Sequence, residues 1–274
     1  MLKRESGSKS TNYGAMAART GNRFWRSRSR RLARARLARP MASARKLAKL
    51  AATPAYWRAL AHGVAATAEH EPALAGRTFA TIVDIGANKG QFAVFARRMW
   101  PSAFIWCFEP MPAAADKLAK VLTGSSRLSR MALGAAPGAA NLHVASRTDS
   151  SSLLPLGVLQ RETFNMSEVG VVEIPVERLD RLVRAEEIAR PALMKIDVQG
   201  FELAALEGAE GVLAAFDAVY VECSYRTLYD GQALAPAVEA HLTARGFALV
   251  GAHNVAALPD GAPLQADLLF ERRA

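Results

Sequence analysis

The sequence predicts an α/β protein with a largely parallel sheet, on three observations. The stretch from Thr81 to Phe92, TIVDIGANKGQF, joins a short apolar strand, a glycine turn and the start of a helix. The stretch from Ala192 to Glu202, ALMKIDVQGFE, repeats this layout in the second half. Two strand–helix–strand units follow one another up to Gly134, and such units have parallel strands and right-handed crossovers. With 274 residues, 51% of them apolar, the chain can hold one such domain with a large core.

The positive charge of the chain is concentrated in its first 50 residues. They carry fifteen Lys and Arg residues and one acidic residue, a net +14, whereas the other 224 residues carry twenty basic and twenty-four acidic residues, a net −4. The domain itself is therefore not predicted to bind nucleic acid specifically. No apolar run approaches the ~18 residues that span a bilayer, and the leader lacks the apolar core of a secretory signal. With two cysteines in apolar segments, we expect a reducing, cytoplasmic setting.

Three segments are predicted along the chain. Residues 1–40 are expected to be a basic, disordered leader. Two alternatives are an interfacial helix that contacts anionic lipid at the inner face of the membrane, and non-specific contact with nucleic acid. Residues 41–75 show helical spacing punctuated by Pro54 and Pro72, which predicts short helices packed on the domain that follows. Residues 76–274 form the main domain.

The main domain opens with a strand at residues 82–85, and Asp84 lies near the carboxyl end of this strand. Gly86 and Gly90 allow a tight turn and the close approach of a ligand to the backbone. Apolar residues at helical spacing then predict a helix that starts near Gly90 and stops before Pro101. The amino terminus of this helix is expected to face the ligand that binds at the glycine turn.

The second strand, Ala103 to Pro110, ends with Glu109 and Pro110. Glu109 lies nineteen residues after Gly90. An acidic residue at this spacing can accept both hydroxyls of a ribose, although a solvated carboxylate that merely ends a strand is the simpler alternative. A helix is predicted from Pro112 to Leu122, and a third strand from Arg127 to Gly134.

Two segments of alternating polarity, Ala139 to Ser146 and Val171 to Leu179, predict a pair of strands inserted between the two halves. They enclose the polar loop Arg147 to Ser152. We expect this insertion to extend the edge of the sheet and to overhang the site. Ser150 and Ser151 either contact an acceptor or only form the turn.

The second half supplies two more acidic strand ends. The fourth strand ends at Asp197, which is followed by Gln199, Gly200 and a helix, and the fifth strand, Ala218 to Cys223, carries Glu222. The remaining elements are a helix from about Leu234 to Arg245 that ends at Gly246, and two closing strands at residues 247–251 and 266–270 joined as an antiparallel pair.

Open α/β sheets bind ligands beyond the carboxyl ends of their strands, where four carboxylates are expected to meet: Asp84, Glu109, Asp197 and Glu222. Lys89 is the only cation that follows the first turn, so this site disfavours pyrophosphate and favours a cationic ligand. S-adenosylmethionine fits, because its ammonium and sulfonium suit the carboxylates and its ribose diol suits Glu109.

The ordered set VDIGANKGQF, CFEP, ERLD, LMKIDVQGFE, VYVECS and QADLLF resembles the FkbM family of S-adenosylmethionine-dependent methyltransferases. The resemblance runs from about Tyr56 to Arg272. It implies a Rossmann-like class I methyltransferase sheet of about seven strands, the last one antiparallel, with helices on both faces. It also implies O-methylation of a hydroxyl on a sugar, glycolipid, polysaccharide or natural product. By position it implies a donor site formed by Asp84, Gly86, Asn88, Gly90, Glu109, Pro110 and Gln199.

Asp197 is the first candidate for the base that accepts the hydroxyl proton, because it ends a strand beside the donor site. Glu222 is the second candidate, and alignment of donor and acceptor without a dedicated base is the third. Lys195, which flanks Asp197, is counted among the catalytic candidates. Acceptor contacts are predicted for Ser150, Ser151 and Asn254. No metal is predicted, since the histidines lack partners at ligand spacing.

Two other functions are compatible with parts of the sequence. One is a nucleotide-dependent oxidoreductase on a Rossmann-like fold. Such an enzyme is expected to have the motif G-x-G-x-x-G, but the turn here reads G-A-N-K-G. The other is a non-catalytic, membrane-associated binding protein in which the basic leader is the working part. The predicted partner is a small-molecule or glycan acceptor of the methyl group. The sequence gives no indication of the oligomeric state.

Overall fold

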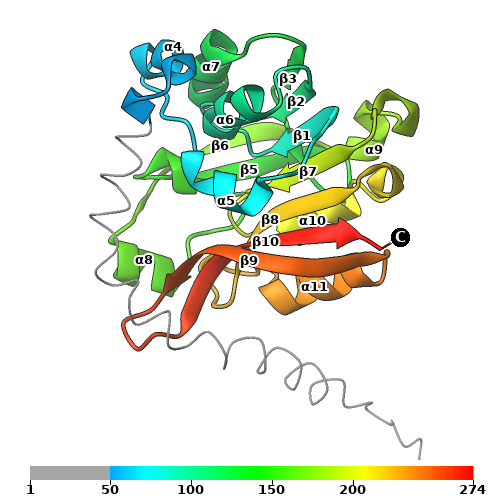
Figure 1. Ribbon diagram of the computed structural model, residues 1–274. Coiled ribbons are helices and arrows are strands. Elements are labelled where there is room, and N and C mark those ends of the chain that lie inside the picture. Colours follow the sequence, from blue (N-terminus) through cyan, green and yellow to red (C-terminus); the bar gives the residue numbers. More distant parts are fainter. Residues whose placement is uncertain (1–49, 274) are drawn as a thin grey trace, which may run out of the picture. The chain divides into compact units, whose positions relative to one another are not determined.

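A computed structural model describes residues 50–273 of the chain, so the leader predicted at residues 1–40 lies outside the described residues. The described part is built on a seven-stranded sheet of order β3-β2-β1-β7-β8-β10-β9 (Figure 1). Five strands are parallel, and β10 is antiparallel to both β8 and β9. The predicted sheet with its antiparallel last strand is confirmed. The bounds are β1 Thr81–Ile85, β2 Phe104–Phe108, β3 Ser126–Ser129, β7 Ala192–Ile196, β8 Ala218–Ser224, β9 Phe247–Ala257 and β10 Pro263–Arg272.

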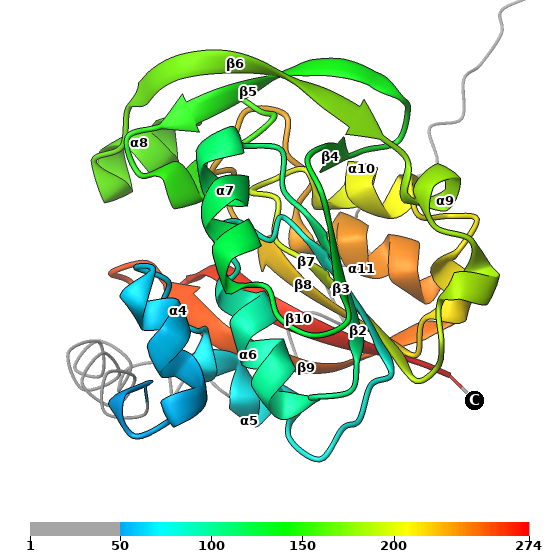
Figure 2. The ribbon, with the colours of Figure 1, turned by 90° about the horizontal axis from the view of Figure 1, so that it is seen from above.

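Helices cover both faces of this sheet (Figure 2). One face carries α6 and α7, and the other carries α10 and α11. The strands supply both cores because alternate side chains point to opposite faces. Ile82 and Leu193 belong to the α6 side, whereas Val83 and Met194 belong to the α10 side. Helix bounds are α6 Gln91–Met99, α7 Pro112–Val121, α9 Leu179–Leu182, α10 Glu202–Glu207 and α11 Ala235–Thr243, with 3-10 turns η5 Ala185–Glu187 and η6 Leu213–Ala215.

The N-terminal part of the described chain is a series of short turns: η2 Pro54–Tyr56, α4 Trp57–Ala61, η3 Ala68–His70 and α5 Glu71–Leu74. Pro54 and Pro72 lie in the first turns of η2 and α5. The backbone N–H that proline lacks is not needed for a helical hydrogen bond there, so the prolines begin these helices. Tyr56 and Leu74 are fully buried and fix the segment against α6.

The insertion forms a sheet of its own, of order β4-β6-β5, over the carboxyl ends of the main strands (Figure 2). The prediction that it extends the edge of the main sheet is wrong. β2 ends at Phe108, so the chain after Ser129 has no further partner there, and residues 132–133 pair with β6 instead. The predicted third strand is thereby split. The bounds are β4 Ala132–Leu133, β5 Gly138–Ala145, η4 Thr148–Ser150, α8 Val158–Phe164 and β6 Glu168–Glu177.

Candidate active site

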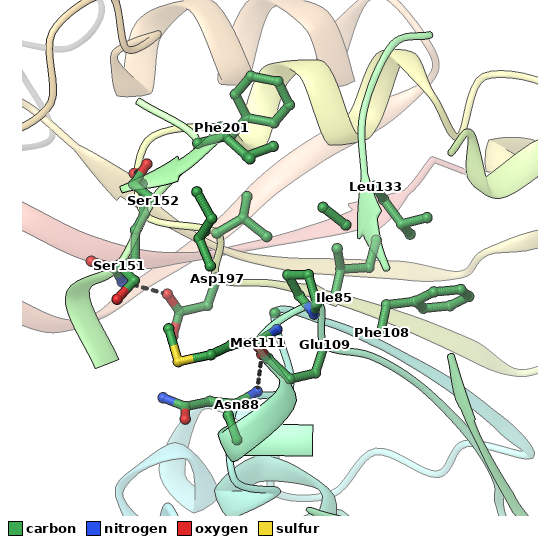
Figure 3. A pocket seen from close by; sticks show the side chains of 18 of the residues that line it. Ile85, Asn88, Phe108, Glu109, Met111, Leu133, Ser151, Ser152, Asp197 and Phe201 are labelled. Atoms are coloured by element: carbon green, nitrogen blue, oxygen red, sulfur yellow. Dashed lines mark hydrogen bonds between the residues drawn. The ribbon is translucent and has the colours of Figure 1, made fainter. Parts of the chain in front are cut away.

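A pocket opens at the carboxyl ends of β1, β2 and β7, beneath the insertion (Figure 3). Its empty volume, open solvent included, is about 700 Å³. The pocket lies where the strand order reverses between β1 and β7, the usual ligand position in such sheets. The walls are lined by Ile85, Gly86, Asn88, Phe108, Glu109, Pro110, Met111, Ala114, Met131, Ala132, Leu133, Leu142, Thr148, Asp149, Ser151, Ser152, Leu153, Asp197, Val198, Gln199 and Phe201.

The glycine turn forms one wall of the pocket and depends on two glycines for different reasons. Gly86 has φ 77°, and a β-carbon there would lie 1.9 Å from the carbonyl oxygen of Asp197. Gly90 begins α6 with φ 94°, and a β-carbon there would lie 2.7 Å from a methyl group of Leu118. Gly86 therefore lets β1 and β7 end side by side at the pocket, whereas Gly90 lets α6 pack on α7 and does not line the pocket.

Glu109 lies in the pocket wall in a fixed orientation. Its Oε2 accepts the Asn88 N–H and its Oε1 accepts the Met111 N–H, both at 2.8 Å. Burial raises the pKa of Glu109, and these two N–H groups oppose the rise. Each carboxylate oxygen has a second lone pair. Glu109 can therefore accept two further hydroxyl protons, as the ribose role requires, and Pro110 lines the pocket beside it.

Asp84 does not line the pocket. Its side chain is fully buried on the α6 face of the sheet, and its Oδ1 lies 3.5 Å from the Lys195 ammonium. Neither carboxylate oxygen accepts a hydrogen bond among the described residues. Burial raises the pKa of Asp84, and Lys195 opposes the rise. Asp84 thus lies outside the lining of the pocket, paired with Lys195.

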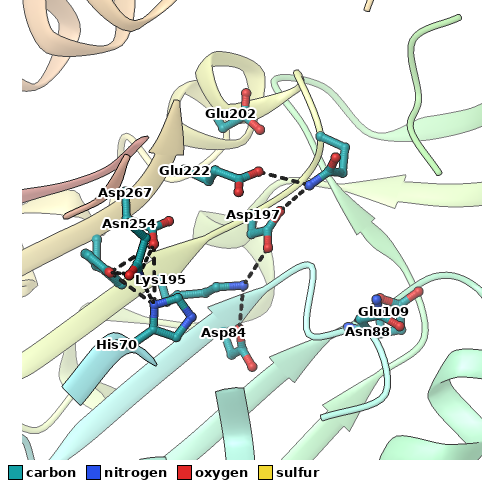
Figure 4. Close-up of polar contacts among 12 residues, drawn as sticks. His70, Asp84, Asn88, Glu109, Lys195, Asp197, Glu202, Glu222, Asn254 and Asp267 are labelled. Carbon is teal, nitrogen blue, oxygen red and sulfur yellow. Dashed lines mark hydrogen bonds and ion pairs between the residues drawn. The ribbon is translucent and has the colours of Figure 1, made fainter. Parts of the chain in front are cut away.

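Lys195 is a counter-ion rather than a base. Its ammonium lies between Asp84 and Asp197, at 3.5 Å and 3.6 Å from their oxygens (Figure 4). It also lies 5.7 Å from the centre of the Phe92 ring. Burial by itself lowers the pKa of Lys195, but Asp197, Asp84 and other carboxylates outweigh burial and raise it overall. The side chain stays protonated at neutral pH and cannot accept a proton from an acceptor.

Asp197 and Glu222 are joined by one side chain. Gln199 Nε2 donates to Asp197 Oδ1 at 2.6 Å and to Glu222 Oε2 at 3.1 Å (Figure 4). The Asp197 side chain is 36% exposed and lines the pocket, whereas Glu222 does not line it. Burial, followed by the charges of Asp197 and Asp267, raises the pKa of Glu222 well above its usual value. Of the two candidate bases, only Asp197 is open to the pocket.

Glu202 supports the loop between Asp197 and α10. It is buried, and its Oε1 accepts the Gly200 N–H at 2.8 Å. Burial raises the pKa of Glu202 to about 7. Its place in the first turn of α10 agrees with the expected preference of an acidic residue for a helix amino terminus.

The three predicted acceptor residues lie in three different surroundings. Ser151 lines the pocket, and its hydroxyl oxygen accepts the Ala145 N–H at 3.2 Å. Ser150 is buried and does not line the pocket. Asn254 belongs to a separate polar cluster, in which its Nδ2 donates to Asp267 at 2.7 Å and lies 3.2 Å from His70 Nδ1 (Figure 4). The structure brings only Ser151 to the pocket.

Sequence reasoning did not single out several residues of the pocket. Ser152 donates its hydroxyl proton to the Gln199 carbonyl at 2.7 Å, which ties the insertion to the loop after β7. In the sequence, the position of Ser152 at the end of the polar loop could have indicated that it lies at the pocket. Met111, Met131 and Leu133 form apolar walls, but their positions depend on the path of the chain after β3, for which the sequence carries no local signal.

No group of three or more His, Cys, Asp or Glu side chains in residues 50–273 is arranged to hold a metal ion. Within the same residues, no helix combines the length and apolarity needed to cross a membrane.

Comparison with known proteins identifies related sequences. NoeI from Sinorhizobium fredii, a 2-O-methyltransferase, is 28% identical over 160 residues, which cover 55% of this chain and 66% of NoeI. Methyltransferase sdnD from Sordaria araneosa is 30% identical over 155 residues, 47% of this chain and 60% of sdnD. AglP from Haloferax volcanii, a hexuronic acid methyltransferase, is 29% identical over 142 residues, 51% of this chain and 54% of AglP. The chain thus spans between half and two thirds of these relatives.

The methyltransferase FkbM domain model matches residues 84–249. The matched region begins at Asp84 and contains the glycine turn, Glu109, the insertion and the loop from Asp197 to Glu202. The match confirms the predicted family. The chain belongs to the FkbM methyltransferase domain family.

Proposed function

We propose that the protein transfers a methyl group from S-adenosylmethionine to a hydroxyl oxygen of a neutral sugar, glycolipid, polysaccharide or natural product. One observation carries the proposal. A fixed carboxylate suited to a ribose, Glu109, and a partly exposed carboxylate suited to a hydroxyl proton, Asp197, line the same pocket.

The residues of the pocket fit the donor. Gly86 lines the pocket, so the donor can contact the backbone of the glycine turn there. Glu109 can accept the two ribose hydroxyls, while Met111 and Met131 offer apolar surface for the adenine ring. The buried Asp84 carboxylate lies outside the pocket, where Lys195 is its counter-ion.

When bound, the donor supplies an electrophilic methyl group, whose bond to sulfur breaks as the bond to the acceptor oxygen forms. Asp197 takes up the hydroxyl proton of the acceptor. Gln199 and Lys195 hold Asp197 in place, through a hydrogen bond of 2.6 Å and an ion pair of 3.6 Å. Alignment of the reacting groups supplies much of the acceleration, so the base acts late.

Charge favours a neutral acceptor. Asp197, Glu222 and Asp267 surround the Lys195 ammonium, which is already paired with Asp84 and Asp197. An acceptor that carries its own carboxylate or phosphate near the reacting hydroxyl would face like charges in a site of low dielectric.

A direct test combines donor binding with an acceptor panel. Calorimetry with S-adenosylmethionine is expected to show binding, and mass spectrometry of a panel of neutral glycosides is expected to show products heavier by one CH₂ group. The matched uronic acids should react at least tenfold more slowly. Absence of both binding heat and methylated product would reject the proposal, and faster reaction of the uronic acids would reject the neutral acceptor alone.

We also propose that the basic leader brings the enzyme to an anionic membrane surface, where glycolipid acceptors would be found. Support comes from the net charge of +14 over the first 50 residues. Vesicles that contain phosphatidylserine should retain the full chain at low salt and release it at high salt, whereas a chain that begins at Met41 should not bind them. Equal binding by both chains would contradict this role for the leader.

A further inference from the structure

Gln199 has an unusual backbone and a fully engaged side chain. Its φ of 54° lies in the left-handed region, which costs a residue with a side chain and is typical of functional sites. Its Nε2 has two protons, and two carboxylates accept them, Asp197 and Glu222. The orientation of this amide therefore sets where the Asp197 carboxylate points.

Tyr229 fixes the other end of the same amide. Its hydroxyl lies 2.7 Å from Gln199 Oε1 and 3.0 Å from the Ser150 carbonyl, and it accepts a hydrogen bond from Gln160 Nε2 at 3.1 Å. An ionised carboxylate only accepts hydrogen bonds, so Nε2 has to face Asp197 and Oε1 has to face Tyr229. The Tyr229 hydroxyl has a single proton, and it must be donated to Gln199 Oε1. Without this proton, Oε1 would face the tyrosine oxygen, which is also an acceptor.

The Tyr229 ring is held from several sides. It is fully buried, and it packs on Gly200, where a β-carbon would lie 3.2 Å from Tyr229 Cδ2. The backbone on either side of Tyr229 is bonded to the insertion: the Gly157 N–H donates to the Leu228 carbonyl at 2.8 Å, and the Asp230 N–H donates to the Pro155 carbonyl at 2.9 Å. The backbone around Tyr229 is thus anchored to the insertion, while the Tyr229 hydroxyl reaches Gln199 in the loop after β7.

We propose that Tyr229 is a positioning residue that sets the Gln199 amide and thereby aims the Asp197 carboxylate into the pocket. This role rests on the proposed methyl transfer, in which Asp197 takes up the acceptor proton. It also links the insertion to the candidate base, because residues 155–157 of the insertion hydrogen-bond to the backbone on either side of Tyr229.

Kinetics of four variants test the proposal. Tyr229→Phe should lower kcat tenfold or more while KM for S-adenosylmethionine stays within twofold, because the donor contacts lie at Gly86 and Glu109. Gln199→Met should lower kcat at least as much. The double variant should be no slower than Gln199→Met alone, since residues that act through one another are not additive. Tyr56→Phe, which removes an equally buried hydroxyl in the N-terminal segment, should keep the wild-type kcat. Additive losses, or Tyr229→Phe within twofold of wild type, would overturn the proposal.

A second readout does not depend on activity. In protein labelled with ¹⁵N at glutamine, the Gln199→Met spectrum identifies the side-chain amide signals of Gln199. In the wild type these two protons should exchange slowly with solvent, and in Tyr229→Phe they should exchange at least tenfold faster. Equal exchange rates in the two proteins would overturn the positioning role. If the exchange rates are as expected but the protein methylates no hydroxyl acceptor, the proposed function is rejected. The positioning of the Gln199 amide by Tyr229 would then still hold.

Discussion

The carbonyl oxygen of Asp197 occupies the space that a β-carbon on Gly86 would need, at 1.9 Å from it. The end of β1 and the end of β7 are thus in direct backbone contact, and the donor turn and the candidate base form one unit. A residue with a side chain at position 86 would push apart the two strands that define the pocket.

The first prediction concerns this contact. Gly86→Ala should destabilise the fold far more than Gly76→Ala, because Gly76 has the same φ of 77° but nothing within 4 Å of a β-carbon. The control should lose about 1–2 kcal/mol from the left-handed backbone alone. Gly86→Ala should lose at least about 2 kcal/mol more from the clash. Urea unfolding measures both, and equal losses would show that the strands can move apart freely.

The second prediction concerns Glu109. Glu109→Ala removes the acceptor of the Asn88 and Met111 N–H groups as well as the ribose carboxylate, so affinity for S-adenosylmethionine should fall at least tenfold. Each unsatisfied N–H should also cost about 1–3 kcal/mol of stability. Calorimetry at a temperature where both proteins are folded checks the affinity. Glu162→Ala, at an exposed position of α8, should bind the donor like the wild type. Unchanged donor affinity in Glu109→Ala would rule out the ribose role.

The third prediction concerns Lys195. Lys195→Met leaves the buried Asp84 carboxylate without its counter-ion, and breaking a buried pair in this way typically costs about 3–5 kcal/mol. Replacing both residues, as Asp84→Asn with Lys195→Met, should recover most of the lost stability because no buried charge remains. Chemical denaturation distinguishes the cases. If the double variant is as unstable as the single one, the cost does not come from the unpaired carboxylate.

The fourth prediction concerns pH and Glu202. Its pKa in the folded protein is about 7, above the usual 4.5 that applies to the unfolded chain. Between pH 4.5 and 7, Glu202 is therefore protonated in the folded state and ionised in the unfolded state. Its contribution to stability is complete below about pH 4.5 and is lost as the pH rises through 7. At roughly 1.4 kcal/mol per unit, the loss is about 3 kcal/mol.

The Glu202→Gln variant isolates this effect, because glutamine keeps the oxygen that accepts the Gly200 N–H and does not titrate. The difference in unfolding free energy between variant and wild type should grow in favour of the variant from pH 5 to pH 8. A difference that is flat over this range would mean that Glu202 ionises in the folded state as readily as in the unfolded one.

Local patterns in the sequence were sufficient for the framework of the fold. The apolar run at residues 82–85, the glycines after it and the repeat of this layout at residues 192–202 predicted the two strand ends that form the pocket, because turns and buried strands depend on neighbouring residues. Glu109 could be placed for the same reason. The antiparallel closing strands followed from the short loop between them.

Other features depend on tertiary contacts that no local pattern encodes. Glu222 lies at a strand end as predicted, but Gln199 separates it from the pocket. Asn254 falls in the His70 cluster because β9 continues to Ala257, well past its predicted end. Tyr229 reaches the site only because its loop bridges to residues 155–157. Each of these outcomes required the packing of elements that lie far apart in the sequence.

Asp197 is proposed to take up the proton of a neutral hydroxyl acceptor during methyl transfer. Transfer of a labelled methyl group from S-adenosylmethionine to a neutral glycoside, followed for the wild type and for Asp197→Asn, tests it most directly. Asp197→Asn should bind the donor within twofold of wild type and should turn over about a hundredfold or more slowly, which is the lower end of what a positioned base contributes. Turnover of Asp197→Asn within about threefold of wild type would contradict this role.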